Sequence, residues 1–239
     1  MELTLSTHLL VYTGIGETLL RTLEGAGFPG LEVWLAEPHL PWKNVAAMEE
    51  LREKFGHHGL RAASVHLPFY PSVPELRERG RRWSLLDPDP AARREALEGA
   101  AQGLHAAAAL GADRAVLHLG WPGDAWDAAA RGRAQEGAGE LLATARAVGV
   151  ELLLENILST GTRTARLVAL LDEIDPGGEA GVCLDLGHAH VFGGVLTELA
   201  DALPRLRHVH VHDNAGDEDR HLAPGQGTIP WEAVLRMLT

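Results

Sequence analysis

Short aliphatic runs alternate along the chain with longer stretches of helical period. The aliphatic runs cover residues 3–9, 30–36, 60–67, 114–120, 150–157, 180–187 and 206–213. The stretches between them are rich in good helix formers, and several end in a glycine, the usual helix stop. Such strand–helix repeats predict parallel strands joined by right-handed crossovers. At about 30 residues per unit, the pattern predicts an α/β fold, the (β/α)8 TIM barrel, as a single domain over residues 1–239.

The pattern of the last residues does not supply the eighth strand and helix of such a barrel. Residues 230–239 are typical of the seventh helix. An open barrel would leave unpaired edges at its first and seventh strands, which natural proteins avoid. We therefore expect that the chain is truncated at its C-terminal end.

Aliphatic side chains occupy one phase of each predicted strand, and metal-capable side chains the other. Leu184 alternates with Asp185, and Val209 alternates with His210. Side chains alternate across a strand, and the outer face of a barrel packs on its helices. The inner phase then brings one group from each of several strands to the C-terminal mouth of the barrel: His66, His118, Glu155, Asp185 and His210. Further candidates lie just beyond strand ends, on loops at that mouth: His188, Asp219 and His221.

This mixture of imidazoles and carboxylates suits zinc, manganese or a similar divalent ion. Buried carboxylates are costly without a cation, so their convergence predicts a bound metal ion. Taken alone, His66 and His118 fit a structural histidine as well as a ligand. His208 fits a packed, hydrogen-bonded histidine deeper in the barrel, and His212 fits a residue that supports a ligand.

Several motifs, in this order, resemble a known superfamily. The segments "LLLEN", "GVCLDLGHAH", "HVHVHDN" and "DEDRHLAPGQGTIPW" are similar to the xylose isomerase-like sugar isomerases and epimerases, which include endonuclease IV. The resemblance implies that Glu155, Asp185 and His210 bind a divalent metal. In the endonuclease-like branch it implies a trinuclear zinc cluster that also uses His66, His118, His188, Asp219 and His221. With the resemblance, the expected number of metal ions is therefore one to three. The superfamily also has a last carboxylate, a glutamate on strand eight, which this sequence does not reach.

Two enzymatic hypotheses follow from these residues and the resemblance. The first is a divalent-metal-dependent isomerase or epimerase acting on a sugar, sugar phosphate or polyol, in which Glu155 is both ligand and acid/base. The second is an endonuclease IV-like multi-zinc phosphodiesterase acting on abasic DNA. Arg77, Arg79, Arg81 and Arg82, expected in the loop after the third strand, could meet a phosphate or form a solvated edge. A third, non-enzymatic hypothesis is a metal-binding or ligand-binding barrel without catalysis.

Residues for the substrate are expected near the last motif and on the strand ends. The segment "PGQG" predicts a turn that brings Arg220 or backbone N–H groups toward an anionic or hydroxylated substrate. We assign Arg220, His188 and Trp121 to substrate binding. Whether Trp34, Trp121 and Phe69 line a pocket or only pack is left open by the sequence.

The composition of the chain limits the kinds of binding partner that we expect. The net charge of −12 disfavours a nucleic acid, because affinity for DNA comes largely from Lys and Arg at phosphates. The chain has one cysteine, Cys183, which excludes an internal disulfide and suits a reducing cytoplasm. No signal peptide and no uninterrupted apolar span are found, so we expect no membrane contact. The expected partner is a small-molecule sugar or sugar phosphate in the cytoplasm, and a homo-oligomer is left open.

Overall fold

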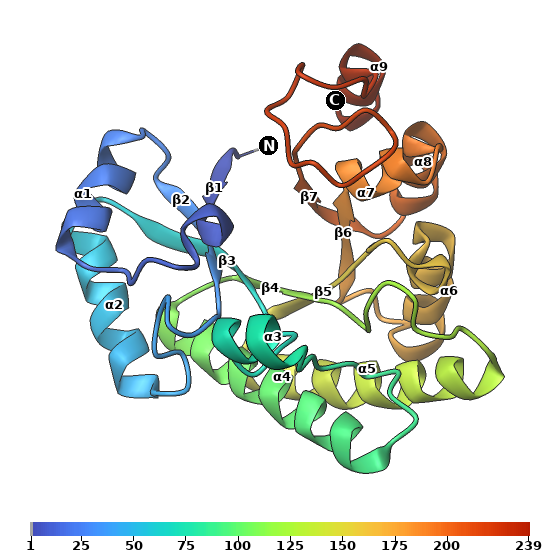
Figure 1. Ribbon diagram of the computed structural model, residues 1–239, viewed down its shortest axis with the longest axis horizontal. Helices are drawn as coiled ribbons and strands as arrows, with labels where there is room; N and C mark the ends of the chain where they lie inside the picture. Colours follow the sequence, from blue (N-terminus) through green and yellow to red (C-terminus); the bar gives the residue numbers. More distant parts are fainter. Residues whose placement is uncertain (1) are drawn as a thin grey trace. The chain divides into compact units, whose positions relative to one another are not determined.

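The protein is an α/β chain whose strands follow one another in sequence order, β1-β2-β3-β4-β5-β6-β7. The computed structural model describes residues 2–239 (Figure 1). The strands are β1 (Thr4–Ser6), β2 (Gly30–Trp34), β3 (Arg61–His66), β4 (Arg114–Leu117), β5 (Glu151–Glu155), β6 (Gly181–Asp185) and β7 (Leu206–His210). Each strand lies inside one of the aliphatic runs, and β1–β2, β2–β3, β3–β4, β5–β6 and β6–β7 pair in parallel. The predicted class of parallel α/β fold is confirmed.

Helices alternate with the strands. They are α1 (Glu17–Gly25), α2 (Val45–His57), α3 (Val73–Arg79), α4 (Pro90–Leu110), α5 (Ala128–Val148), α6 (Thr164–Ile174), α7 (Leu186–Val191), α8 (Val195–Ala202) and α9 (Trp231–Leu238). Asp89 fixes the start of α4, because its side chain caps the helix by accepting a hydrogen bond from Ala91 N. Its end is also as expected, since Gly111 adopts φ 76°, a left-handed conformation that glycine allows. None of the helices in residues 2–239 is long and apolar enough to cross a membrane.

Two helices correct the sequence-based placement of candidate residues. Arg77 and Arg79, expected in a loop, lie on α3. His188, also expected on a loop, lies in α7. Both helices are short, so they carry too few turns for a recognisable apolar period. Their starts are fixed instead by side-chain caps: Ser72 accepts from Glu75 N, and Asp185 accepts from His188 N.

The chain divides into two compact units. The first unit contains the residues up to Leu117 together with Glu140–Leu152, and the second contains His118–Gly139 together with Leu153–Thr239. In the first unit, β2 is buried along its whole length and α4 packs closely on the end of β3. A Cβ at Gly103 would lie 2.8 Å from Leu67 Cδ2, so a glycine permits this close approach. That the chain is a single domain stays a prediction.

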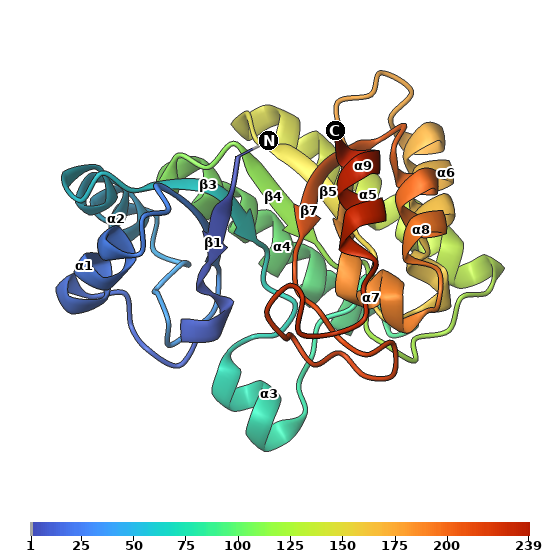
Figure 2. The same cartoon turned by 90° about the horizontal axis from the view of Figure 1, so that it is seen from above.

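The second unit is built around β6, which is buried at every residue. Helices α6 and α8 pack against β6 and against each other. Figure 2 shows these two helices side by side. Glu198 of α8 is 2% exposed and accepts hydrogen bonds from Thr164 N and Oγ1 at the start of α6. Arg163 pairs with the same carboxylate, so this buried charge is compensated. This packing supports β6, which pairs with β5 on one side and with β7 on the other.

Candidate metal centre

Two buried carboxylates end neighbouring strands of the second unit. Glu155 is the last residue of β5 and Asp185 the last of β6, and each is 2% exposed. The side-chain amide of Asn156 joins these strand ends. Its Oδ1 accepts a hydrogen bond from Asp185 N at 2.6 Å, and its Nδ2 donates to Asp185 O at 3.0 Å. The two like charges are therefore held near each other, an arrangement that is costly unless cations offset it.

Imidazoles lie against both oxygens of Glu155. His118 Nε2 is 2.9 Å from Oε2, and His210 Nδ1 is 3.0 Å from Oε1. Burial alone would raise the pKa of Glu155, but the charges of His210 and His118 hold that pKa well below its ordinary value. Glu155 is thus an ionised carboxylate at neutral pH, placed between two nitrogen ligands.

Asp185 joins the end of β6 to the helix that follows. Its Oδ1 accepts a hydrogen bond from His188 N at 2.7 Å, which caps α7. Its Oδ2 lies 3.0 Å from His212 Nε2 and 3.7 Å from His210 Nδ1. Although burial raises it, the pKa of Asp185 is lowered overall, chiefly by the charge of His188. One carboxylate therefore faces several imidazoles at once.

His188 is oriented by a backbone carbonyl. Its Nδ1–H donates to Asn156 O at 2.8 Å, while its Nε2 lies 3.3 Å from Asp219 Oδ2. A bond of this kind fixes the tautomer, so that in the neutral ring Nε2 carries the lone pair for a metal. Burial lowers the pKa of His188, but the charge of Asp185 and the hydrogen bond with Asp219 raise it to about 10. Without a metal the His188 ring is therefore protonated at neutral pH. Binding of a metal to this ring requires the loss of that proton.

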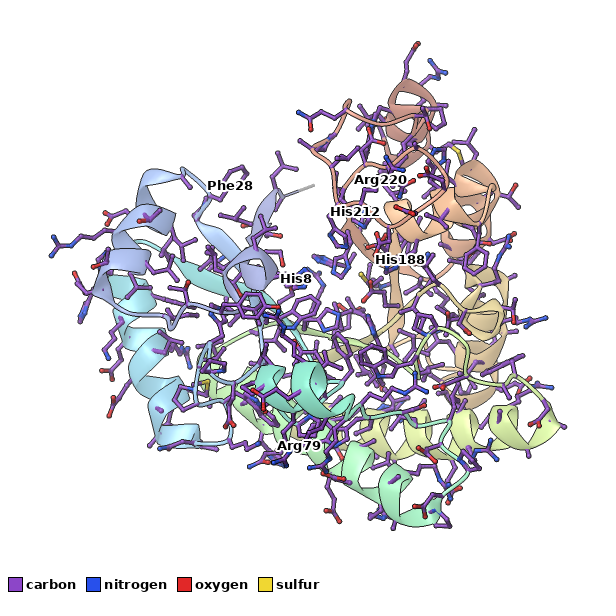
Figure 3. All side chains as sticks on the ribbon, in the orientation of Figure 1. His8, Phe28, Arg79, His188, His212 and Arg220 are labelled. Carbon is purple, nitrogen blue, oxygen red and sulfur yellow. The ribbon has the colours of Figure 1, made fainter. Side chains whose placement is uncertain are left out.

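A further group lies on the loop after β7. The rings of His212 and His221 stack at 4.0 Å, and His221 Nε2 is 3.2 Å from Asp219 Oδ2. His221 has φ 48°, the one non-glycine residue in 2–239 with a positive φ. Such backbone strain tends to gather at functional sites. Figure 3 labels His188 and His212, whose rings meet edge to face at 5.9 Å.

Two buried polar atoms of this region bear on whether a cation fits. Within the described part of the chain, Asp219 Oδ1 and His212 Nδ1 are buried and have no hydrogen-bond partner. An unsatisfied buried carboxylate oxygen is costly, and a cation removes that cost. The donors also cluster: in each of three overlapping sets the ligand atoms lie within 4.8 Å of one another. The sets are Glu155, Asp185 and His210; Asp185, His188 and His212; and His212, Asp219 and His221.

These nitrogen and oxygen donors fit a divalent ion such as zinc or manganese. Asp185 belongs to two of the sets and His212 to two, so neighbouring ions could share a bridging ligand. We use the name metal centre for the eight side chains that form this group. They are His118, Glu155, Asp185, His188, His210, His212, Asp219 and His221.

Asp213 organises the loop that carries Asp219 and His221. It is fully buried, and its carboxylate accepts hydrogen bonds from Gly225 N at 2.8 Å, Ile229 N at 3.2 Å and Trp231 Nε1 at 2.8 Å. Its backbone pairs with Leu222 in an isolated antiparallel bridge. Despite burial, these bonds lower the pKa of Asp213 to about 2. The loop is therefore a fixed structure closed around one ionised carboxylate.

This network changes the expectation for the "PGQG" turn. Gly225 N–H, expected to face a substrate, donates instead to Asp213 within the protein. A Cβ at Gly227 would lie 2.2 Å from Asn214 O, so this position of the turn requires glycine. Arg220 is exposed and pairs with Asp217 at 2.6 Å. Its assignment to substrate binding stays a prediction, as does that of Trp121.

His66 lies in the first unit, as the last residue of β3. It is 1% exposed, and its ring stacks on Trp34 with centroids 3.8 Å apart. The ring of His8 also stacks on Trp34, with centroids 4.2 Å apart. The ring nitrogen Nδ1 of His66 donates to Leu67 O at 3.0 Å. Its role as a metal ligand stays a prediction.

Sequence reasoning did not include His212, Asn156 and Asp213 among the site residues. The signal for His212 was present, because it shares the strand phase of His210 and ends the same histidine-rich run. Asn156 follows Glu155 directly, but its link to Asp185 depends on the pairing of β5 with β6. Asp213 forms contacts up to 18 residues away, which no local pattern predicts.

The chain belongs to the xylose isomerase-like TIM barrel family, whose model matches residues 20–239. It is similar to the crystal structure of a D-tagatose 3-epimerase-like protein, with 20% identity and a TM-score of 0.83, covering 100% of this chain and 86% of that one. It is also similar to the TTHB071 protein of Thermus thermophilus, solved after soaking with zinc chloride. That match has 31% identity and a TM-score of 0.71 over 98% of this chain and 86% of the other. The predicted superfamily and barrel fold are confirmed.

Among curated relatives, a probable endonuclease 4 of Methanoculleus marisnigri is 37% identical over 109 residues, which is 37% of this chain and 39% of that protein. The curated relatives that the chain matches are all covered over less than two thirds of their own length, from 19% to 66%.

Proposed function

We propose that this protein is a divalent-metal-dependent isomerase or epimerase acting on a sugar, sugar phosphate or polyol. The observation that carries the proposal is the buried meeting of Glu155, Asp185 and His210, whose ligand atoms lie within 4.8 Å of one another. The family supports it, and so does the likeness of the fold to a D-tagatose 3-epimerase-like protein. The zinc-soaked relative, at 31% identity, supports a metal at such a site.

The chemistry requires a base beside a polarised carbonyl. A bound divalent ion would supply that polarisation, lowering the cost of removing the proton on the neighbouring carbon. Glu155 is the residue we assign to proton transfer, with Oε2 as the accepting atom. His118 Nε2, at 2.9 Å, holds this oxygen in place, and His210 Nδ1 holds Oε1. Because Glu155 is 2% exposed, little water competes for its carboxylate.

Exchange of solvent deuterium into candidate ketoses tests the proposal. The metal-loaded protein is incubated in heavy water, and deuterium next to the carbonyl is measured by NMR. Glu155→Gln is expected to slow exchange by at least about 100-fold, since general acid–base catalysis contributes about 10²–10⁴-fold. Glu151→Gln, at the other end of the same strand, is the matched control and should retain exchange. Absence of exchange with every sugar tried, in a protein with bound metal, would overturn the proposal.

A second candidate is a multi-zinc phosphodiesterase acting on abasic DNA. It is favoured by the additional donors His212, Asp219 and His221, and by the similarity to a probable endonuclease 4. The net charge of −12 opposes it, because DNA binding needs cationic contacts to phosphates. Incubation of a duplex that contains one abasic site separates the two candidates. Zinc-dependent cleavage that is abolished by EDTA would establish the phosphodiesterase, and an intact duplex would exclude it.

A further inference from the structure

A second kind of ligand set lies beside the metal centre, on the same two strands. In the pairing of β6 with β7, Cys183 is opposite His208, and Asp185 is opposite His210. Residues two positions apart on a strand share a face of the sheet. The cysteine–histidine pair therefore shares a face with the aspartate–histidine pair of the metal centre, one step nearer the start of the strands.

The cysteine and both histidines of this ladder come together. The ligand atoms of Cys183, His208 and His210 lie within 4.8 Å of one another. The two imidazole rings meet edge to face, with centroids 5.5 Å apart. Cys183 is fully buried, and the two histidines are half-buried. We call these three residues the thiol triad.

The geometry points to the thiol triad as a binding site for a thiophilic metal ion, separate from the proposed isomerase chemistry. A thiolate with two imidazoles suits a soft ion such as Cu⁺, whereas the carboxylates and imidazoles of the metal centre suit less thiophilic ions such as Zn²⁺ or Mn²⁺. On binding, the Cys183 S–H bond breaks, a sulfur–metal bond forms, and the proton passes to solvent. No oxidant or reductant takes part.

His210 belongs to both sets of ligands. Its Nδ1 lies 3.0 Å from Glu155 Oε1 in the metal centre, and the same side chain is the third member of the thiol triad. A thiophilic ion in the triad therefore withdraws His210 from the ion bound at Glu155 and Asp185. Binding of a soft metal ion at the thiol triad should therefore weaken binding of a harder ion at the metal centre.

Titration of the metal-free full-length chain with Co²⁺ tests the proposal. Cobalt bound by a thiolate gives a sulfur-to-metal charge-transfer band in the near ultraviolet, and the chain has only one cysteine as its source. We expect the band in the wild type and its loss in Cys183→Ser. His208→Ala should weaken the cobalt affinity read from the band by roughly tenfold or more. His39→Asn, which removes a buried histidine that contacts Thr7 and Thr13 and belongs to neither set of ligands, is the matched control and should keep the band.

A second measurement does not depend on the folding of any variant. X-ray absorption at the cobalt edge of the wild type, kept monodisperse by gel filtration, should show one sulfur neighbour beside nitrogen and oxygen. A cobalt shell without sulfur, or a band that persists in a folded Cys183→Ser protein, would overturn the proposal. Because these readouts do not depend on a sugar, they remain decisive even if deuterium exchange is never observed.

Discussion

Two histidines, the buried His39 of the first unit and the half-buried His188 of the second, experience opposite environments. In the first unit, His39 is 1% exposed, its Nδ1–H donates to Thr13 O, and its Nε2 lies 3.0 Å from Thr7 Oγ1. Burial lowers the pKa of His39, so the ring is a neutral part of the core. In the second unit, the charge of Asp185 overcomes burial and raises the pKa of His188 to about 10. The comparison teaches that neighbouring carboxylates, rather than burial, distinguish a metal-capable histidine from a structural one.

The largest effect on metal binding is expected from removing the charge of Asp185, which distinguishes His188 from His39. Asp185→Asn keeps the size of the side chain and its cap on α7, but it removes a ligand shared by two of the sets. Loss of a group that only supports a ligand costs about 10–100-fold in metal affinity, so we expect a loss of more than about 100-fold here. Isothermal titration with Zn²⁺ measures it. A folded variant with wild-type affinity would refute the assignment of Asp185.

The pH dependence of zinc binding sharpens the same contrast. The metal must displace the proton of His188, whose pKa is about 10. Zinc affinity should therefore rise by about tenfold per pH unit between roughly pH 6.5 and 9, with release of one proton from this ring. Titration in buffers of different ionisation enthalpy counts the protons. A flat affinity over this range would show that His188 is not a ligand.

The stability of the metal-free protein should change in the opposite direction. A pKa raised on folding contributes stability that is fully present below the unfolded value of 6.5 and is lost as pH rises toward about 10. We expect the midpoint of urea unfolding, measured in the presence of EDTA, to fall over this window. Zinc should reverse the fall, because it binds the deprotonated ring of the folded state. Unchanged midpoints from pH 6.5 to 10 would contradict the charge assigned to His188.

Much of the fold could be predicted from the alternation of side chains along the strands, whereas parts of the site could not. Alternation on β5, β6 and β7 was enough to predict that Glu155, Asp185 and His210 meet. The presence of each strand was also predictable from its aliphatic run, but its end was not, since β4 ends at Leu117 and β7 at His210, each three residues before the end of its run. The helix α7 was not, because its start depends on one capping bond from Asp185.

The environment of each histidine was less accessible from sequence. The stacking of His66 on Trp34 and the contact of His210 with Glu155 both depend on residues of other strands. Such contacts are set by tertiary packing, and no local spacing encodes them. For the same reason the fold of the loop around Asp213 could not be predicted from the "PGQG" turn.

A steric change near His212 is expected to have a moderate effect. A Cβ at Gly187 would lie 1.9 Å from His212 Cε1, so Gly187→Ala must displace the ring. We expect a loss of stability of about 1–3 kcal/mol, as for overpacking, together with weaker zinc binding. Gly132→Ala, in α5 where nothing lies within 4 Å, is the matched control and should be neutral or stabilising. Equal urea midpoints for the two variants would refute this packing.

The smallest effect on metal binding is expected from the first unit. His39→Asn should lower stability by about 1–2 kcal/mol through the loss of buried hydrogen bonds. Zinc stoichiometry and affinity should not change, because the side chain contacts Thr7 and Thr13 rather than carboxylates. Metal analysis after dialysis checks this. A variant that loses zinc while remaining folded would break the contrast between the two histidines.

An anomalous-difference map from crystals grown with Zn²⁺ tests the metal centre most directly. We predict a peak within about 2.0–2.2 Å of a carboxylate oxygen of Glu155 or Asp185 and of the His210 imidazole. Zinc peaks found only elsewhere on the protein, with none beside Glu155, Asp185 and His210, would contradict the account.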